Sequence, residues 1–191
     1  TAAKTKDKAS APLPTWPDEV YRVLKEAGVK QVAMVPDAGH SRLIRAFEAD
    51  PQTRLVTLTT EEEGVAMLAG AWLGGQRGVL LLQSSGVGNC INMLSLPAIC
   101  HMPLLMLVTM RGDFGEFNPA QVPMGNATQA VLEAMGTLVK RADAAEDIGW
   151  ATTLASASEV PGSTRSTRRS AGSSPLMRST RTCTPLDGPV Y

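Results

Sequence analysis

Short apolar runs alternate with amphipathic patterns along most of the chain. The runs predict strands and the patterns between them predict helices. We expect strands at 31–35, 54–58, 78–83 and 104–109, and helices at 17–27, 41–49, 61–73, about 88–99 and 127–135. The strands show no alternation with polar residues, so we predict an α/β fold whose parallel sheet has helices on both faces.

The loops that follow the predicted strands carry the candidate chemistry. Ligands of parallel sheets bind at the carboxyl ends of the strands. These loops cover 35–40, 59–63, 83–89 and 110–125, and each contains polar or glycine residues that the strands lack. We therefore expect the functional site where these loops meet.

Three adjacent glutamates begin the predicted helix in the stretch TEEEGVAMLAGAWLGG. Acidic residues in a first turn interact favourably with the helix dipole, and a preceding threonine could cap a free backbone N–H. Successive helical residues point about 100° apart, so Glu61, Glu62 and Glu63 cannot share one solvated stripe. The residues that follow leave the helix without a polar face. We therefore expect at least one carboxylate to enter the protein, where a charge must be paired, protonated or used.

Composition narrows the class of protein. A chain of 191 residues has room for one α/β domain and little more. Basic and acidic residues both number 18, so the formal net charge is zero and a nucleic-acid partner is not expected. No apolar run is suited to span a bilayer, and the N-terminus lacks the apolar core of a signal peptide. These features predict a cytoplasmic protein that does not bind membranes.

The predicted domain occupies residues 15–157. Residues 1–14 are polar and rich in lysine and alanine, which predicts a flexible segment. Residues 158–191 are rich in serine, threonine, arginine and proline, which predicts a disordered tail. A basic nucleic-acid-binding tail is one alternative. A shifted reading frame or a diverged gene end is another, because the composition changes within an apparent helix that begins near Asp143.

The cysteines do not predict a metal site in this chain. Three cysteines without a CxxC spacing, joined only by His40 and His101, are a poor set of zinc ligands. Cys90 and Cys100 are instead expected to be small buried hydrophobic residues of a reducing compartment.

The segment QSSGVGN, residues 83–89, places two glycines between a predicted strand and a predicted helix. Such glycines allow a phosphate group to approach the backbone and the helix N-terminus. The segment lacks the third glycine of a dinucleotide fingerprint and the Gly-Lys-Ser/Thr of a P-loop. From these residues, a ligand loop and a tight structural turn remain equally open.

Longer motifs indicate a family. The stretches GVLLLQSSGVGNCINMLSL, PLLMLVTMRGDFGEFNPAQVPMG and EEEGVAMLAGAW resemble the pyrimidine-binding (PYR) domain of thiamine-diphosphate-dependent 2-oxo acid decarboxylases. Within that family, the resemblance is to α subunits of sulfopyruvate decarboxylases first and to phosphonopyruvate decarboxylases second. It runs from about residue 20 to residue 136 and implies thiamine diphosphate as the cofactor.

The resemblance implies a role for one of the three glutamates. The family places an acidic residue at the start of the helix after the second strand, where its carboxyl group bonds N1′ of the cofactor's aminopyrimidine ring. The small-residue run that follows assigns this catalytic and cofactor-binding role to Glu62, which is then the carboxylate expected to enter the protein. Glu61 and Glu63 keep the ordinary roles of dipole interaction and capping.

The resemblance also assigns residues around the cofactor. Gly86, Val87, Gly88 and Asn89 match the loop that flanks the pyrimidine ring and the substrate. Gln121 matches a glutamine that faces the active site in related enzymes.

Two further positions have alternative roles. Asp37 and His40 follow the first strand, where the wider family often places polar groups on the substrate side. His40 could anchor a sulfonate or phosphonate, or it could be a surface-loop histidine. Arg111 and Asp113 could form an ion pair that fixes their loop.

One motif of the family has no counterpart in this sequence. Thiamine-diphosphate enzymes hold the diphosphate through Mg²⁺ on a second domain, with a Gly-Asp-Gly motif and a later asparagine, and the chain has neither. The resemblance therefore implies a β subunit that carries this domain and most of the Mg²⁺ site, with the active site at the subunit interface. The residues expected in or beside that interface are Ala66, Ala69, Gly70 and Leu73.

The leading hypothesis is the PYR subunit of a heteromeric decarboxylase that acts on a short anionic 2-oxo acid. Sulfopyruvate is the first candidate substrate and phosphonopyruvate the second. One alternative is an inactive remnant that keeps the fold. Another is a nucleotide-binding regulatory domain that uses the glycine segment.

Overall fold

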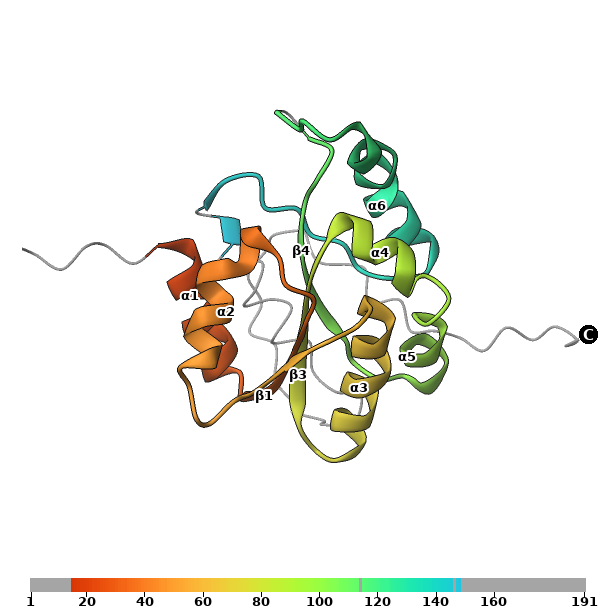
Figure 1. Cartoon of the computed structure of the whole chain (residues 1–191). Coiled ribbons are helices and arrows are strands. Elements are labelled where there is room, and N and C mark those ends of the chain that lie inside the picture. Colours follow the sequence, from red (N-terminus) through yellow and green to blue (C-terminus); the bar gives the residue numbers. More distant parts are fainter. Residues whose placement is uncertain (1–14, 114, 146, 149–191) are drawn as a thin grey trace, which may run out of the picture. The chain divides into compact units, whose positions relative to one another are not determined.

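The computed structural model describes residues 15–113, 115–145 and 147–148 (Figure 1). The predicted segments 1–14 and 158–191 lie outside these ranges, as does the rest of the helix expected from near Asp143. The chain divides into units 1–160 and 161–191, and all described residues belong to the first. The domain boundaries therefore stay a prediction.

Four parallel strands form a sheet in the described part of the chain, in the order β2-β1-β3-β4. This arrangement confirms the predicted α/β class, and each strand end lies within two residues of its predicted position. The strands are β1 (Val29–Met34), β2 (Arg54–Thr57), β3 (Arg77–Gln83) and β4 (Leu105–Thr109).

Helices cover both faces of the sheet (Figure 1). Helices α1 and α2 lie on one face, and α3, α4, α5 and α6 lie on the other. The helices are α1 (Trp16–Glu26), α2 (Ser41–Glu48), α3 (Glu61–Leu73), α4 (Ser84–Cys90), α5 (Ser95–Cys100) and α6 (Val122–Ala134), with the short 3-10 turns η1 (Ala38–His40) and η2 (Pro119–Gln121).

Two helix predictions are wrong. The single helix expected at about 88–99 is two short helices, and α4 begins at Ser84, so QSSGVGN is largely helical rather than a loop. Glycine disfavours helix formation, so the sequence did not indicate a helix here, but burial of Gly86 and Val87 outweighs that preference. Helix α6 begins at Val122 instead of 127. Pro123 lies in its first turn, where proline is tolerated because the backbone N–H groups there have no partner within the helix.

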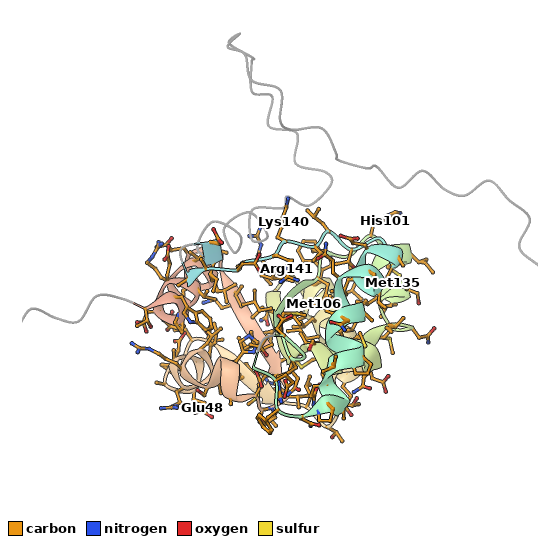
Figure 2. All side chains as sticks on the ribbon, turned by 90° about the horizontal axis from the view of Figure 1, so that it is seen from above. Glu48, His101, Met106, Met135, Lys140 and Arg141 are labelled. Atoms are coloured by element: carbon orange, nitrogen blue, oxygen red, sulfur yellow. The ribbon has the colours of Figure 1, made fainter. Side chains whose placement is uncertain are left out.

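The central strand β3 divides the core into two layers. Val79 and Leu81 face α1 and α2, whereas Leu80 and Leu82 face α3, α4 and α6, and all four side chains are fully buried. Seen from above, side chains fill the space between the sheet and both helix layers, with Glu48 at the C-terminal end of α2 and Met135 directly after α6 (Figure 2). The unbroken apolar run of β3 is therefore explained by its burial on both faces.

Helix α6 packs directly on the backbone of the loop that follows β4. A Cβ atom at Gly125 would collide with the carbonyl oxygen of Arg111 and lie 3.1 Å from Cα of Gly112. Only glycine fits this contact without movement of the backbone. In contrast, a Cβ at Gly70 in α3 would meet nothing within 4 Å.

We predict opposite effects on stability for alanine substitutions at Gly125 and Gly70. Gly125→Ala should lower the free energy of unfolding by about 1–3 kcal/mol, because an added methyl group overpacks a close contact. Gly70→Ala should raise it by about 0.5–1 kcal/mol, because alanine has the higher helix propensity. Urea unfolding of the two variants measures both effects, and a stabilising Gly125→Ala would contradict the close approach of α6 to the loop.

Candidate active site

Polar side chains meet at the carboxyl ends of β1, β3 and β4. The hydroxyl group of Thr109 donates a hydrogen bond to Asp37 Oδ2 at 2.6 Å, and the Gln83 amide donates to Asp37 Oδ1 at 3.4 Å. The hydroxyl group of Ser85 in turn donates to Gln83 Oε1 at 2.8 Å. Asp37 is thus the centre of a hydrogen-bonded cluster that ties the ends of the three strands together.

His40 belongs to the same cluster and is not a surface residue. It is only 3% exposed, so the prediction of a surface-loop histidine is wrong. Its Nδ1 atom lies 3.8 Å from Asp37 Oδ2 and has no hydrogen-bond partner among the described residues. Burial lowers the pKa of His40, and the Asp37 carboxylate opposes this shift. Burial thus favours the neutral form of an imidazole that lies beside a carboxylate.

The three glutamates at the start of α3 differ in exposure to solvent, because successive helical residues point in different directions. Glu61 is 7% exposed, whereas Glu62 and Glu63 are exposed. Glu62, the carboxylate expected to enter the protein, is therefore exposed in the single chain, because the first helical residue, Glu61, is the one that faces α4. No threonine side chain caps the helix; instead Glu63 Oε2 accepts a hydrogen bond from the backbone N–H of Thr59 at 2.9 Å.

Glu61 contacts the helix that contains the glycine segment. Its Oε2 atom accepts a hydrogen bond from Asn89 Nδ2 at 2.8 Å. A Cβ atom at Gly86 would lie 2.5 Å from Glu61 Cδ, so the carboxylate fills the space beside this glycine. Burial, with smaller effects of Glu61 and Glu62, raises the pKa of the Cys90 thiol to about 12. Glu62 is thus close to α4 although its carboxylate is exposed.

This arrangement changes the roles open to the glycine segment. Val87 is fully buried, so its side chain belongs to the core, and Gly86 is covered by Glu61. Gly88 is half-buried and Asn89 is exposed. A phosphate group would have no free approach to Gly86, which argues against the nucleotide-binding alternative.

The exposed side of α3 carries Glu62 and Glu63 in its first turn and then only small or apolar residues. Glu62, Ala66 and Gly70 are exposed at helical spacing, and Leu73 is 75% exposed. Ala69 does not belong to this stripe, because it is buried in the chain's own core. An apolar helix face of this kind is typical of a surface that another protein covers.

The loop after β4 is fixed by an ion pair, but not the predicted one. Arg111 Nε and Nη2 donate to the two carboxylate oxygens of Glu116, both at 2.7 Å, rather than to Asp113. Glu116 Oε2 also accepts from the backbone N–H of Gly112 at 3.2 Å, and Oε1 accepts from that of Asn118 at 2.9 Å. Mainly because of Arg111, the pKa of Glu116 falls to about 2.

Gln121 follows this loop in η2. Its side-chain Oε1 atom is buried and has no hydrogen-bond partner in the described part of the chain. Such an acceptor is unfavourable unless a donor reaches it. This is compatible with the predicted role of Gln121 beside a ligand but does not test it.

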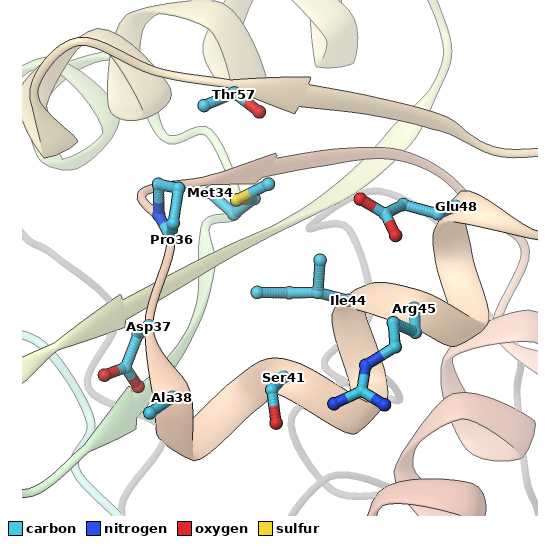
Figure 3. Close-up of a pocket in the computed structure, with 9 residues that line it drawn as sticks. All are labelled: Met34, Pro36, Asp37, Ala38, Ser41, Ile44, Arg45, Glu48 and Thr57. Carbon is cyan, nitrogen blue, oxygen red and sulfur yellow. The ribbon is translucent and has the colours of Figure 1, made fainter.

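A surface pocket of about 490 Å³ lies on the α2 side of β1 and β2 (Figure 3). Asp37 and Ala38 line one end, and Ser41, Arg45 and Glu48 of α2 line the other parts. Asp37 is the one member of the hydrogen-bonded cluster in its lining. The pocket therefore borders the cluster but does not contain Glu62.

No group of three or more His, Cys, Asp or Glu side chains among the described residues is arranged to hold a metal ion. None of the described helices has the length and apolar character needed to cross a bilayer.

Cys100, predicted to be buried, is exposed at the end of α5, where His101 turns the chain with a positive φ of 52°.

Sequence reasoning missed several members of this site. Gln83 and Thr109 are the last residues of their strands, and a polar residue that ends an apolar run was the signal that could have identified them. Glu61 and Glu116 had no such signal. The partner of Glu61, Asn89, is distant in sequence, and Glu116 is chemically equivalent to Asp113 as a partner for Arg111.

Fold and site together define a domain of the thiamine pyrophosphate (thiamine diphosphate) enzymes. The N-terminal TPP-binding domain of these enzymes matches residues 15–114, and the chain belongs to this family. Among its relatives, sulfopyruvate decarboxylase subunit alpha of Methanothermobacter thermautotrophicus is 39% identical over 142 residues, which cover 72% of this chain and 86% of that protein. Phosphonopyruvate decarboxylase of Streptomyces viridochromogenes is 42% identical over 108 residues, or 56% of this chain and 27% of that protein.

A solved structure shares the fold at low sequence identity. The thiamine diphosphate-dependent 4-hydroxybenzoylformate decarboxylase of Rhodococcus jostii RHA1 superimposes with a TM-score of 0.60 at 17% identity. The match covers 74% of this chain and 27% of that one. The described domain thus corresponds in fold to a part of a larger enzyme.

We predict that the Arg111–Glu116 ion pair stabilises the chain down to low pH. Because the pKa of Glu116 is lowered from 4.5 to about 2, its contribution is complete above pH 4.5 and is lost as the pH falls toward 2. Glu116→Gln should therefore lower the urea midpoint at pH 7, and the difference from wild type should shrink between pH 4.5 and 2. Asp113→Asn is the matched control and should change little; a larger effect of Asp113→Asn would contradict the pairing.

Proposed function

We propose that this chain is the pyrimidine-binding subunit of a thiamine-diphosphate-dependent decarboxylase that acts on a short anionic 2-oxo acid. Sulfopyruvate, converted to sulfoacetaldehyde and CO₂, is the first candidate substrate, and phosphonopyruvate is the second. The similarity to proteins named sulfopyruvate decarboxylase subunit alpha supports the reaction. The observation that carries the proposal is the exposed Glu62 carboxylate at the head of the apolar stripe of α3.

The residues present fit one half of the cofactor. An aminopyrimidine ring needs a carboxyl group at N1′, and Glu62 offers one that the chain itself leaves free of hydrogen bonds to other described residues. Gly88 and Asn89 are the members of the glycine segment that remain accessible to a ligand. When bound, thiamine diphosphate supplies a thiazolium ring that accepts the electron pair released on loss of CO₂.

The roles of the chain's own residues follow from this placement. Glu62 would bind the pyrimidine N1′ and hold or release the proton at that atom. Asp37, His40 and Gln121 are the candidates on the substrate side. Asp37 is anchored by Thr109, and His40 in its neutral form would act through hydrogen bonding rather than charge, which makes it a weaker anchor for a sulfonate than a cation would be.

The remaining half of the site is assigned to a partner. A β subunit that carries the diphosphate-binding domain would hold Mg²⁺ and would cover the stripe of Glu62, Ala66, Gly70 and Leu73. The word alpha in the names of the relatives supports a partner subunit. In this arrangement Glu62 becomes buried on assembly, so its exposure in the single chain is consistent with the proposed role.

We predict that Glu62→Gln abolishes turnover. The chain is co-expressed with a β subunit that has the Gly-Asp-Gly motif, and CO₂ release from sulfopyruvate is measured with thiamine diphosphate and Mg²⁺. The substitution should lower the rate by about 10²–10⁴-fold, the range typical of losing a group that moves a proton. Glu63→Gln, on the same helical turn, is the control and should stay within a few-fold of wild type.

Two results would contradict this assignment. A Glu62→Gln complex within a few-fold of the wild-type rate would remove Glu62 from catalysis. A wild-type complex that assembles but releases no CO₂ from either substrate would favour the inactive remnant.

We predict that the α3 stripe is required for assembly. Ala66→Arg places a guanidinium group in the centre of the stripe, and an unpaired buried charge costs several kcal/mol, so affinity for the β subunit should fall by at least about 100-fold. Ala49→Arg, exposed at the end of α2 on the opposite face of the sheet, is the control and should bind normally. Co-purification and titration of the tagged subunit measure the difference; equal binding by both variants would exclude this stripe as the interface.

A further inference from the structure

Glu61 is the buried carboxylate of α3 that the proposed function leaves without a role. It is the first residue of the helix and lies immediately before Glu62. Its hydrogen-bond partner is the Asn89 amide of α4, whose donor atom lies 2.8 Å from Glu61 Oε2. A bond to a neutral amide offsets only part of the cost of burying a carboxylate, so the position is not explained by stability alone.

The same carboxyl group occupies the space beside Gly86. A Cβ atom on Gly86 would lie 2.5 Å from Glu61 Cδ and 2.6 Å from Cγ, and it would collide with Oε1. Gly86 and Asn89 are three residues apart in α4, so they present the same face of that helix to Glu61. One side chain therefore contacts α4 both by steric fit and by a hydrogen bond.

These contacts determine the spacing between the start of α3 and the glycine segment. Glu62 directly follows Glu61 in α3, and Gly88 and Asn89 lie in the same helix, α4, as Gly86. A shift of the Glu61 carboxylate would consequently move Glu62 relative to the accessible part of the segment. Catalytic groups lose much of their effect when displaced by about 1 Å.

We infer that Glu61 is a positioning residue that clamps the N-terminus of α3 to Gly86 and Asn89 of α4 and thereby places Glu62 for the cofactor. The catalytic consequence rests on the proposed function, but the clamp itself does not. It also assigns the Asn89 side chain to Glu61 rather than to the cofactor, which leaves the Asn89 backbone for that role.

The clamp is tested in the full chain alone by a double-mutant cycle. Gly86→Ala should lower the thermal unfolding midpoint of the wild-type chain, because the new methyl group displaces the Glu61 carboxylate and breaks its bond to Asn89. In the Glu61→Ala background that space is empty, so adding Gly86→Ala should cost less than half as much. Additive effects of the two substitutions would overturn the clamp.

The positioning role is tested in the complex with the β subunit by comparing Glu61→Ala, Glu61→Gln, Glu62→Gln and Glu63→Gln below their melting temperatures. Glu61→Ala should lower kcat and raise the half-saturating concentration of thiamine diphosphate, each by about tenfold. Glu61→Gln keeps an acceptor for Asn89 and should restore most of both, whereas Glu62→Gln should stay inactive. Glu63→Gln is the matched control.

Each outcome of the comparison decides the inference. If Glu61→Ala melts lower but keeps both kinetic parameters, the role is structural only and positioning is overturned. If Glu61→Gln is as inactive as Glu62→Gln, Glu61 itself acts on the cofactor and positioning is again overturned. If the wild-type complex is inactive, the proposed function fails, while the cycle in the single chain still decides the clamp.

Discussion

Burial of β3 on both faces is the constraint from which the arrangement of the site follows. Its residues Val79 to Leu82 are completely excluded from solvent, so helices must cover the sheet on both sides. Its neighbours β1 and β4 run parallel to it, which brings their carboxyl ends to one edge. Gln83 and Thr109 end their strands at this edge, and Asp37 follows the end of β1, so both side chains can donate hydrogen bonds to Asp37. A cluster of polar groups from three distant parts of the chain is the consequence.

Unlike β3, which is buried on both faces, helix α3 is covered on one side only. Its buried side packs on β3 through Gly64, Val65 and Leu68, and its other side remains apolar and exposed from Ala66 to Leu73. A helix without a polar face is stable in water when both sides are covered. Under the proposed function, the exposed side of α3 would lie in the subunit interface, and Glu62 at its start would supply half of the cofactor site.

The predictions from sequence succeeded where a local pattern determines the outcome and failed where contacts decide between similar residues. The strands and the bounds of α3 follow directly from apolar runs and periodicity. The helical state of QSSGVGN does not, because its glycines favour a turn until α3 and α6 pack against them. Arg111 could choose between Asp113 and Glu116, and only the loop geometry, with backbone N–H groups converging on Glu116, favours the second.

Residue patterns along the chain are enough to predict the parallel α/β sheet, the family and a buried carboxylate among Glu61, Glu62 and Glu63. Periodicity and motif spacing carry that information, because they depend on the order of residues along one element. Which of the three glutamates is buried follows from the packing of α4 beside the first turn of α3, which no local pattern predicts. Three consecutive residues of equal charge are equivalent in sequence, and the position of Gly86 and Asn89 across the contact makes them different.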